Sequence, residues 1–113
     1  MHELRIAEDL AAIVVEIARK EDLSKVTKVC LAFGQLVQIV PDIFDSAFRI
    51  TVMGSVAADA ELAIEILPVK LRCRSCGNDF SLEGNLFSCA VCNSTDIDII
   101  QGKEMFIKSI EGE

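Results

Sequence analysis

Four cysteines arranged in two pairs constrain the fold of this chain more than any other feature. Each pair has the spacing CxxC, and twelve residues separate the second cysteine of one pair from the first of the other. Two thiolates at this spacing can bind one ion from a single tight turn, and a second such turn completes a tetrahedral site. The sequence therefore predicts a structural zinc ion held in a small zinc-ribbon module by Cys73, Cys76, Cys89 and Cys92.

We expect this module to cover residues 69–98 and to depend on its metal. A segment of this length cannot bury enough apolar surface to fold unaided, whereas structural zinc contributes about 10 kcal/mol in isolated fingers. Gly77 and Asn93 follow the two pairs, and both residue types tolerate the left-handed backbone that lets turn N–H groups point at the sulfurs. The expected apolar core of the module is Phe80, Leu82, Leu86 and Phe87.

The same four cysteines allow other interpretations. Iron bound by four thiolates is chemically possible, and a pair of disulfides would require an oxidising compartment that nothing else in the chain indicates. A catalytic zinc is disfavoured because four thiolates leave no open position for a water molecule. The fifth cysteine, Cys30, lies in an apolar run, which favours a buried and inert thiol.

The composition is that of a packed globular protein, with 51% hydrophobic and 26% charged residues among 113. The formal net charge of −7 argues against a nucleic-acid partner, because phosphate backbones are bound mainly by lysine and arginine. No apolar run approaches the roughly 18 residues that a membrane span needs. Glu3, Arg5, Glu8 and Asp9 charge the N-terminal segment, unlike a secretory signal. We therefore expect a cytoplasmic protein.

Hydrophobic periodicity predicts two helices. Apolar residues recur at three- and four-residue steps between Leu4 and Lys20, which indicates an amphipathic helix; they are Ile6, Leu10, Ile13, Val14 and Ile17. Pro41 suits the first turn of a second helix, and Gly54 is a natural stop after it. The expected buried face of this second helix is Ile43, Phe44, Ala47, Phe48 and Val52.

Several apolar runs outside the cysteine module predict strands. Val26 to Phe33 is closed by Gly34, and Leu36 to Val40 could extend the same sheet. Leu62 to Leu67 forms a second run, ended by Pro68. After the cysteines, strand-like spacing returns in Ile97, Ile99, Ile100 and the stretch Met105 to Ile110.

These elements predict an α+β fold, with two helices packed on a three-stranded mixed sheet and a zinc ribbon inserted late in the chain. We expect residues 1–68 to form the α/β domain, and residues 99–113 to return to it as the final strand. Residues 69–98 are then the inserted ribbon.

The single histidine of the chain, His2, directly follows the first methionine. A lone histidine near a terminus is usually only solvated, but the atoms around this one can form a metal site. The Met1 amine, the His2 imidazole and the backbone amides of His2 and Glu3 offer four nitrogens in nearly one plane when a metal displaces the amide protons. Ni(II) and Cu(II) favour such a field, whereas zinc does not. We expect Met1 to be retained, because histidine is too bulky for normal removal of the methionine.

A set of short motifs spread over almost the whole chain resembles the HypA/HybF nickel metallochaperones. The motifs are Met1-His2-Glu3, Gly34 leading to Pro41-Asp42 and Phe44, Ala47-Phe48, Glu65 to Pro68, the two CxxC pairs and Gly102-Lys103-Glu104-Met105. Zinc ribbons alone are common. A ribbon placed late in a small acidic α/β protein that begins MHE is far more specific.

The resemblance implies a non-enzymatic role in the maturation of [NiFe] hydrogenase. It implies that the protein accepts Ni(II) at Met1, His2 and Glu3 and delivers it to the hydrogenase large subunit with a HypB-type GTPase. The four cysteines would hold zinc, and the oligomeric state stays open between a monomer and a homodimer. Some relatives have histidines beside the zinc ligands, whereas this chain has residues such as Asn78 and Asn93, which argues against coupling of the two metals through histidines there.

Two other functions are compatible with the sequence. The chain could be a zinc-ribbon module that binds proteins, with no metal role for His2. It could also be an electron carrier with iron at the cysteines, which colour would reveal because a zinc protein is colourless. The carboxylate of Glu3 is ambiguous as well, between contact with a partner and capping of the first helix.

Overall fold

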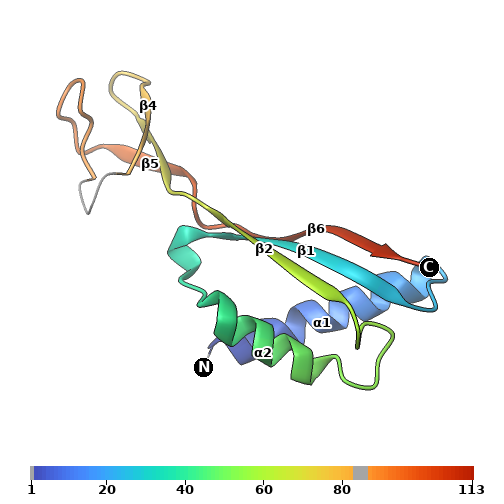
Figure 1. Cartoon of the computed structure of the whole chain (residues 1–113). Helices are drawn as coiled ribbons and strands as arrows, with labels where there is room; N and C mark the ends of the chain where they lie inside the picture. The colour runs from blue at the N-terminus through green and yellow to red at the C-terminus, as the bar shows by residue number, and fades with distance from the viewer. Residues whose placement is uncertain (1, 83–86) are drawn as a thin grey trace. The chain divides into compact units, whose positions relative to one another are not determined.

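The computed structural model describes residues 2–82 and 87–113. Its elements are, in chain order, α1 (His2–Lys20), β1 (Val26–Gly34), the short 3-10 helix η1 (Gln35–Val37), α2 (Pro41–Thr51), β2 (Glu61–Leu67), β3 (Lys70–Cys73), β4 (Asp79–Ser81), β5 (Ile97–Gln101) and β6 (Met105–Gly112) (Figure 1). Contacts divide the described residues into two compact units. The helical unit takes its residues from 1–32, 39–65 and 106–113, and the cysteine unit takes its residues from 33–38 and 66–105.

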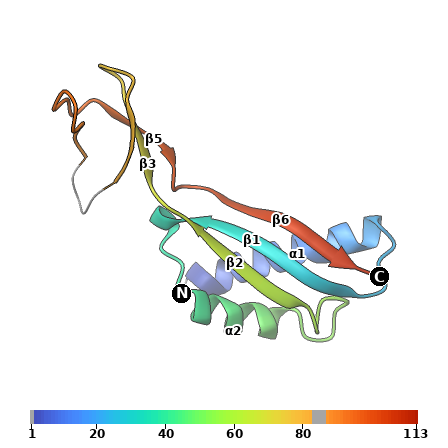
Figure 2. The ribbon, with the colours of Figure 1, turned by 45° about the horizontal axis from the view of Figure 1, so that its top comes forward.

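The helical unit is built on a mixed sheet with the strand order β2-β1-β6. β6 runs antiparallel to β1, since Lys25 and Glu113 exchange two backbone hydrogen bonds of 3.3 and 2.9 Å and the Thr27 hydroxyl donates to the carbonyl of Glu111. The colour gradients in Figure 1 show β1 and β2 running in the same direction. Both helices lie on one face of this sheet, as Figure 2 shows. The prediction of two helices on a three-stranded mixed sheet is confirmed.

The core of the helical unit differs in part from the predicted faces. α1 and α2 pack against each other, and the Phe44 and Phe48 rings of α2 stack with centroids 6.0 Å apart. Two predicted core residues are wrong, because Ile13 is 47% exposed and Ile43 is 54% exposed. On α1 the buried apolar positions are Ala7, Leu10, Ala11, Val14 and Ala18. These positions follow one another at steps of three and four residues along one stripe of the helix, and Ile13 lies outside that stripe.

The expected extension of the sheet by Leu36 to Val40 is also wrong, because the chain turns into η1 after Gly34. A Cβ atom on Gly34 would lie only 2.1 Å from the backbone carbonyl of Gly102, so only glycine fits at this crossing. The N–H of Leu36 then donates to the same carbonyl at 2.8 Å. Gln38, in the left-handed region with φ 60°, ends the turn.

The cysteine unit contains a second sheet with the order β4-β3-β5, in which both pairings are antiparallel. Val69 and Leu71 are buried in this unit together with two of the cysteines. Phe87, expected in its core, is 44% exposed, whereas Phe80 and Leu82 are half-buried. The predicted core position Leu86 lies outside the described residues. A ribbon this small buries the centre of its sheet and two of its cysteines, and it leaves Phe87 in contact with solvent.

Among the described residues, neither helix combines the length and the apolar content that crossing a bilayer requires.

Candidate metal centres

The two CxxC segments fold into turns with the same backbone hydrogen bonds. The N–H of Gly77 donates to the carbonyl of Cys73, and the N–H of Asn93 donates to the carbonyl of Cys89, both at 2.8 Å. In each turn the first cysteine also donates its own N–H to a carbonyl five residues ahead, at 2.9 Å. Gly77 and Asn93 have φ values of 77° and 59°, which confirms the predicted left-handed conformation.

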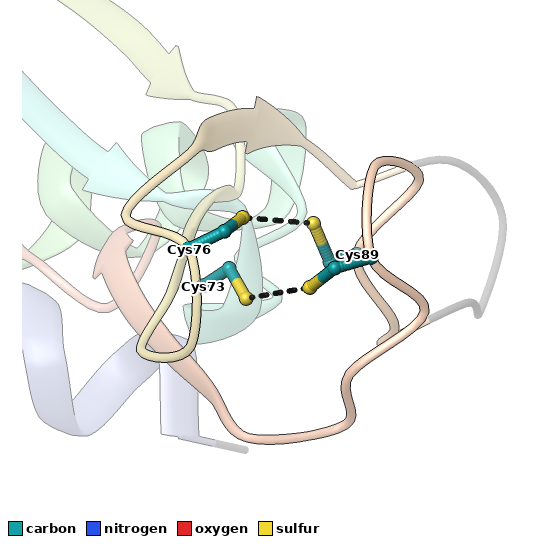
Figure 3. A group of neighbouring side chains, drawn as sticks. Cys73, Cys76 and Cys89 are labelled. Carbon is teal, nitrogen blue, oxygen red and sulfur yellow. Dashed lines mark hydrogen bonds between the residues drawn. The ribbon is translucent and has the colours of Figure 1, made fainter.

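These turns bring the four predicted cysteines together. All four sulfurs lie within 4.8 Å of one another, and the closest approaches are 3.5 Å for Cys73–Cys92 and 3.6 Å for Cys76–Cys89. Figure 3 shows the Cys76 sulfur directed toward that of Cys89 on the other turn, with the Cys73 side chain beside Cys76. A tetrahedron with metal–sulfur bonds of about 2.3 Å has edges of about 3.8 Å, so the arrangement fits one zinc-sized ion. No cysteine is in a disulfide, which contradicts the disulfide interpretation.

Backbone N–H groups aimed at the sulfurs favour thiolates at the first position of each turn. The N–H of Cys76 makes the largest contribution to lowering the pKa of Cys73 to about 6. The N–H of Cys92 has the same leading role in lowering the pKa of Cys89. For Cys92 the N–H of Ser94 lowers the pKa, but the Cys73 sulfur, burial and the two remaining thiols together raise it to about 12. Four sulfurs this close therefore need a cation before all of them can be ionised.

Polar contacts outside the sulfur cluster join the two turns and attach the first one to β5. The hydroxyls of Ser75 and Ser94 lie 3.0 Å apart across the gap between the turns. The Arg74 guanidinium pairs with Asp98 on β5 and lies 3.7 Å from Asp96. The same pairing with Arg74 is the leading cause of a lowered pKa at Asp98. These contacts fix the spacing of the turns from outside the cluster.

The other predicted site lies at the start of α1, in the helical unit. The His2 side chain is 54% exposed, and its Nε2 lies 3.9 Å from Oε2 of Glu3. The backbone amides of His2 and Glu3 are the first two of α1, where no backbone carbonyl lies one turn earlier in the helix to accept their N–H groups. Met1, the remaining predicted ligand, lies outside the described residues. The arrangement offers an imidazole and two terminal helix amides at one end of the chain.

The Glu3 carboxylate turns inward rather than toward solvent. Its side chain is only 9% exposed, and its Oε2 accepts a hydrogen bond from the N–H of Val40 at 3.3 Å. The pKa of Glu3 is lowered, chiefly by a hydrogen bond from its own backbone N–H and next by that from Val40. Sequence reasoning missed this contact. A signal was available, since Glu3 shares the buried face of α1 with Ala7 and Leu10 at spacings of four and seven residues.

Cys30 lies on β1, half-buried rather than fully buried as expected. It belongs to the helical unit and takes no part in the four-cysteine cluster.

Comparison with known proteins gives a consistent result over the whole chain. Residues 1–112 match the family model described as "Hydrogenase/urease nickel incorporation, metallochaperone, hypA". The chain is 40% identical over its full length to the hydrogenase maturation factor HypA of Wolinella succinogenes, of which 96% is covered. It is equally similar to that of Desulfitobacterium hafniense, of which 99% is covered.

Solved structures agree with these sequence matches. The solution structure of the Ni metallochaperone HypA from Helicobacter pylori superposes with a TM-score of 0.71 and 30% identity, covering 97% of this chain and 96% of that one. A second solution structure of a HypA protein gives a TM-score of 0.78 at 31% identity, covering 100% of this chain and 97% of that one. The chain belongs to the HypA family of nickel-incorporation metallochaperones.

Proposed function

We propose that this protein binds Ni(II) at its N-terminus and delivers it to the large subunit of a [NiFe] hydrogenase, together with a HypB-type GTPase. The observation that carries the proposal is the start of α1, where an exposed imidazole adjoins the first two backbone amides of the helix. The nickel ligands are the Met1 amine, the His2 imidazole and the backbone nitrogens of His2 and Glu3. Membership of a nickel-incorporation family supports this choice over Cu(II).

The charge of the proposed site suits a cargo ion. Two deprotonated amides balance the two positive charges of Ni(II), while the amine and the imidazole are neutral ligands, so the loaded site has no net charge. Every ligand binds a proton when the pH falls, and protonation therefore competes with the metal. The exposed His2 side chain also leaves the ion within reach of ligands from a receiving protein.

We assign the four clustered cysteines to structural zinc. Cys73, Cys76, Cys89 and Cys92 would hold the ion with their sulfurs, and four thiolates leave no position for a substrate. When bound, the zinc supplies a cross-link between the two turns and compensates the charge of the thiolates. The chain acts as a carrier in this proposal, not as an enzyme.

The test is a nickel titration of protein with its native first residue, beside three variants. We expect His2→Ala, and a form with one residue added before Met1, to bind nickel about a hundredfold more weakly or worse, a loss of about 3 kcal/mol. Arg5→Ala, an exposed change in the same helical turn, serves as the matched control and should bind as the parent does. Equal binding by all four proteins would remove the proposed site and favour a zinc-ribbon interaction module instead.

A further inference from the structure

A buried carboxylate next to an exposed metal-ligand candidate is unusual at the first turn of a helix. Glu3 is the one charged residue among the buried side chains of the described residues, whereas its neighbours His2, Leu4 and Arg5 are exposed. Burial of a carboxylate is unfavourable unless hydrogen bonds replace its water. The contact that Glu3 makes must therefore stabilise this turn enough to keep the carboxylate inside.

The donor to Glu3 is the N-cap residue of the other helix. Val40 is the N-cap of α2 and has no side-chain cap hydrogen bond of its own. In a capping box, a glutamate three residues into a helix accepts the N–H of the N-cap. That position of α2 is Ile43, which has no acceptor. Glu3 supplies the missing carboxylate from α1, at a sequence separation of 37 residues.

Electrostatics favour the same arrangement. A negative charge at the N-terminus of a helix interacts well with the helix dipole, and Glu3 lies within hydrogen-bond distance of the start of α2 while also belonging to the first turn of α1. The first turn of a terminal helix ordinarily frays. The Glu3 carboxylate contacts the N-termini of both helices. It therefore opposes fraying of the first turn of α1, where the proposed nickel ligands lie.

We propose that the Glu3 side chain is a positioning group that fastens the first turn of α1 to the N-cap of α2 and so presents His2 to nickel in one orientation. This inference rests on the proposed nickel function. It assigns Glu3 two separate roles, with its backbone nitrogen as a ligand and its carboxylate as a fastening. A turn that is already ordered loses less conformational entropy when nickel binds, so the free-energy cost of binding is smaller.

Two pairs of variants test the fastening from both of its ends. Glu3→Ala removes the acceptor, whereas Glu3→Gln keeps an oxygen that can accept from Val40. Val40→Pro removes the donor N–H but keeps the carbonyl that accepts from the N–H of Phe44. Val40→Ala is its matched control, because it retains the N–H and trims only an exposed side chain.

We expect Glu3→Ala and Val40→Pro to weaken nickel binding about tenfold, the scale of losing one hydrogen bond to a charged group. Glu3→Gln should recover most of the affinity lost in Glu3→Ala, and Val40→Ala should bind within about threefold of the parent. Amide hydrogen exchange supplies a readout that does not involve nickel. The N–H of Val40 should exchange slowly in the parent and in Glu3→Gln, and quickly in Glu3→Ala.

Two outcomes would overturn the inference while leaving the proposed function standing. One is parent-like nickel affinity in both Glu3→Ala and Val40→Pro while His2→Ala loses the ion. The other is equal weakening in Glu3→Gln and Glu3→Ala, which would make the charge itself a nickel contact. If Glu3→Ala fails to fold, the two Val40 variants decide the matter alone. Parent-like binding by His2→Ala would instead refute the proposed function.

Discussion

The cysteine cluster and the start of α1 show two different ways in which one small chain can offer ligands to a metal ion. The cluster takes all its donor atoms from side chains on two turns with matching hydrogen bonds. Cys73 and Cys89 are buried, and backbone N–H groups donate to their sulfurs. The start of α1 offers an exposed imidazole and main-chain nitrogens at the end of the chain. In the proposed function the cluster retains its ion, and the terminus exchanges one.

The charge of the two donor sets separates them further. Four thiolates around a divalent ion leave a net charge of −2, whereas two amide anions leave none. Removal of the ion from the cluster exposes four crowded sulfurs to mutual repulsion. Loss of an ion from the terminus needs only the return of protons. We therefore expect perturbations of the cluster to affect folding and perturbations of the terminus to affect exchange.

The largest effect is expected from breaking the cluster. Cys89→Ser replaces a buried sulfur and should remove most of the stabilisation that zinc gives the cysteine unit, on the order of 10 kcal/mol. Zinc content and the dispersion of amide signals from that unit measure the change. Cys30→Ser is the control, since Cys30 lies outside the cluster. Retention of one tightly bound zinc by Cys89→Ser would show that the sulfur is not a ligand.

A smaller effect is expected from the backbone of the second turn. Asn93 has φ 59°, where a β-branched residue costs about 1–2 kcal/mol, so Asn93→Val should weaken zinc binding about tenfold in competition with a chromophoric chelator. Asn93→Gly should bind zinc as the parent does, because glycine already occupies the equivalent position of the first turn, with φ 77° at Gly77. Equal loss in both variants would mean that the Asn93 side chain, not its conformation, supports the site.

The smallest effect concerns the helical unit and its pH dependence. The pKa of Glu3 is lowered in the folded protein by its own N–H and that of Val40. A lowered folded-state pKa stabilises the fold above the unfolded value, and this contribution is lost as the pH falls through the folded value. Urea unfolding should therefore show a larger stability gap between the parent and Glu3→Gln at neutral pH than at about pH 3. A constant gap would contradict the hydrogen-bonded carboxylate.

Much of the secondary structure and the cysteine cluster can be predicted from the sequence, because both depend on the preferences of single residues and on short spacings. The Pro41 start of α2 and the left-handed residues after each cysteine pair are single-residue requirements of backbone geometry. The paired CxxC spacing likewise determines which side chains converge. These features need no knowledge of distant contacts, and they appear in the structure as expected.

Several errors concern contacts between segments that are distant in the sequence. Periodicity placed Ile13 and Ile43 on buried faces but could not show how far each face is covered. The turn after Gly34 depends on its crossing with Gly102, 68 positions further along the chain. The inward turn of Glu3 depends on Val40 in the same way. A local sequence pattern can single out a residue such as Gly34 or Glu3, but it does not show which distant residue that residue contacts.

The central claim is that the protein retains zinc at the cysteine cluster and exchanges nickel at its N-terminus. One dialysis experiment tests this claim most directly. Protein loaded with zinc and nickel is dialysed against a moderate chelator at about pH 7.5 and about pH 5.5, and both metals are then measured in the retained protein. We expect nickel to be lost on acidification with zinc retained. The His2 imidazole is exposed, whereas the zinc ligands Cys73 and Cys89 are buried and backbone N–H groups stabilise their thiolates. Parallel loss of both metals, or loss of zinc before nickel, would contradict the account.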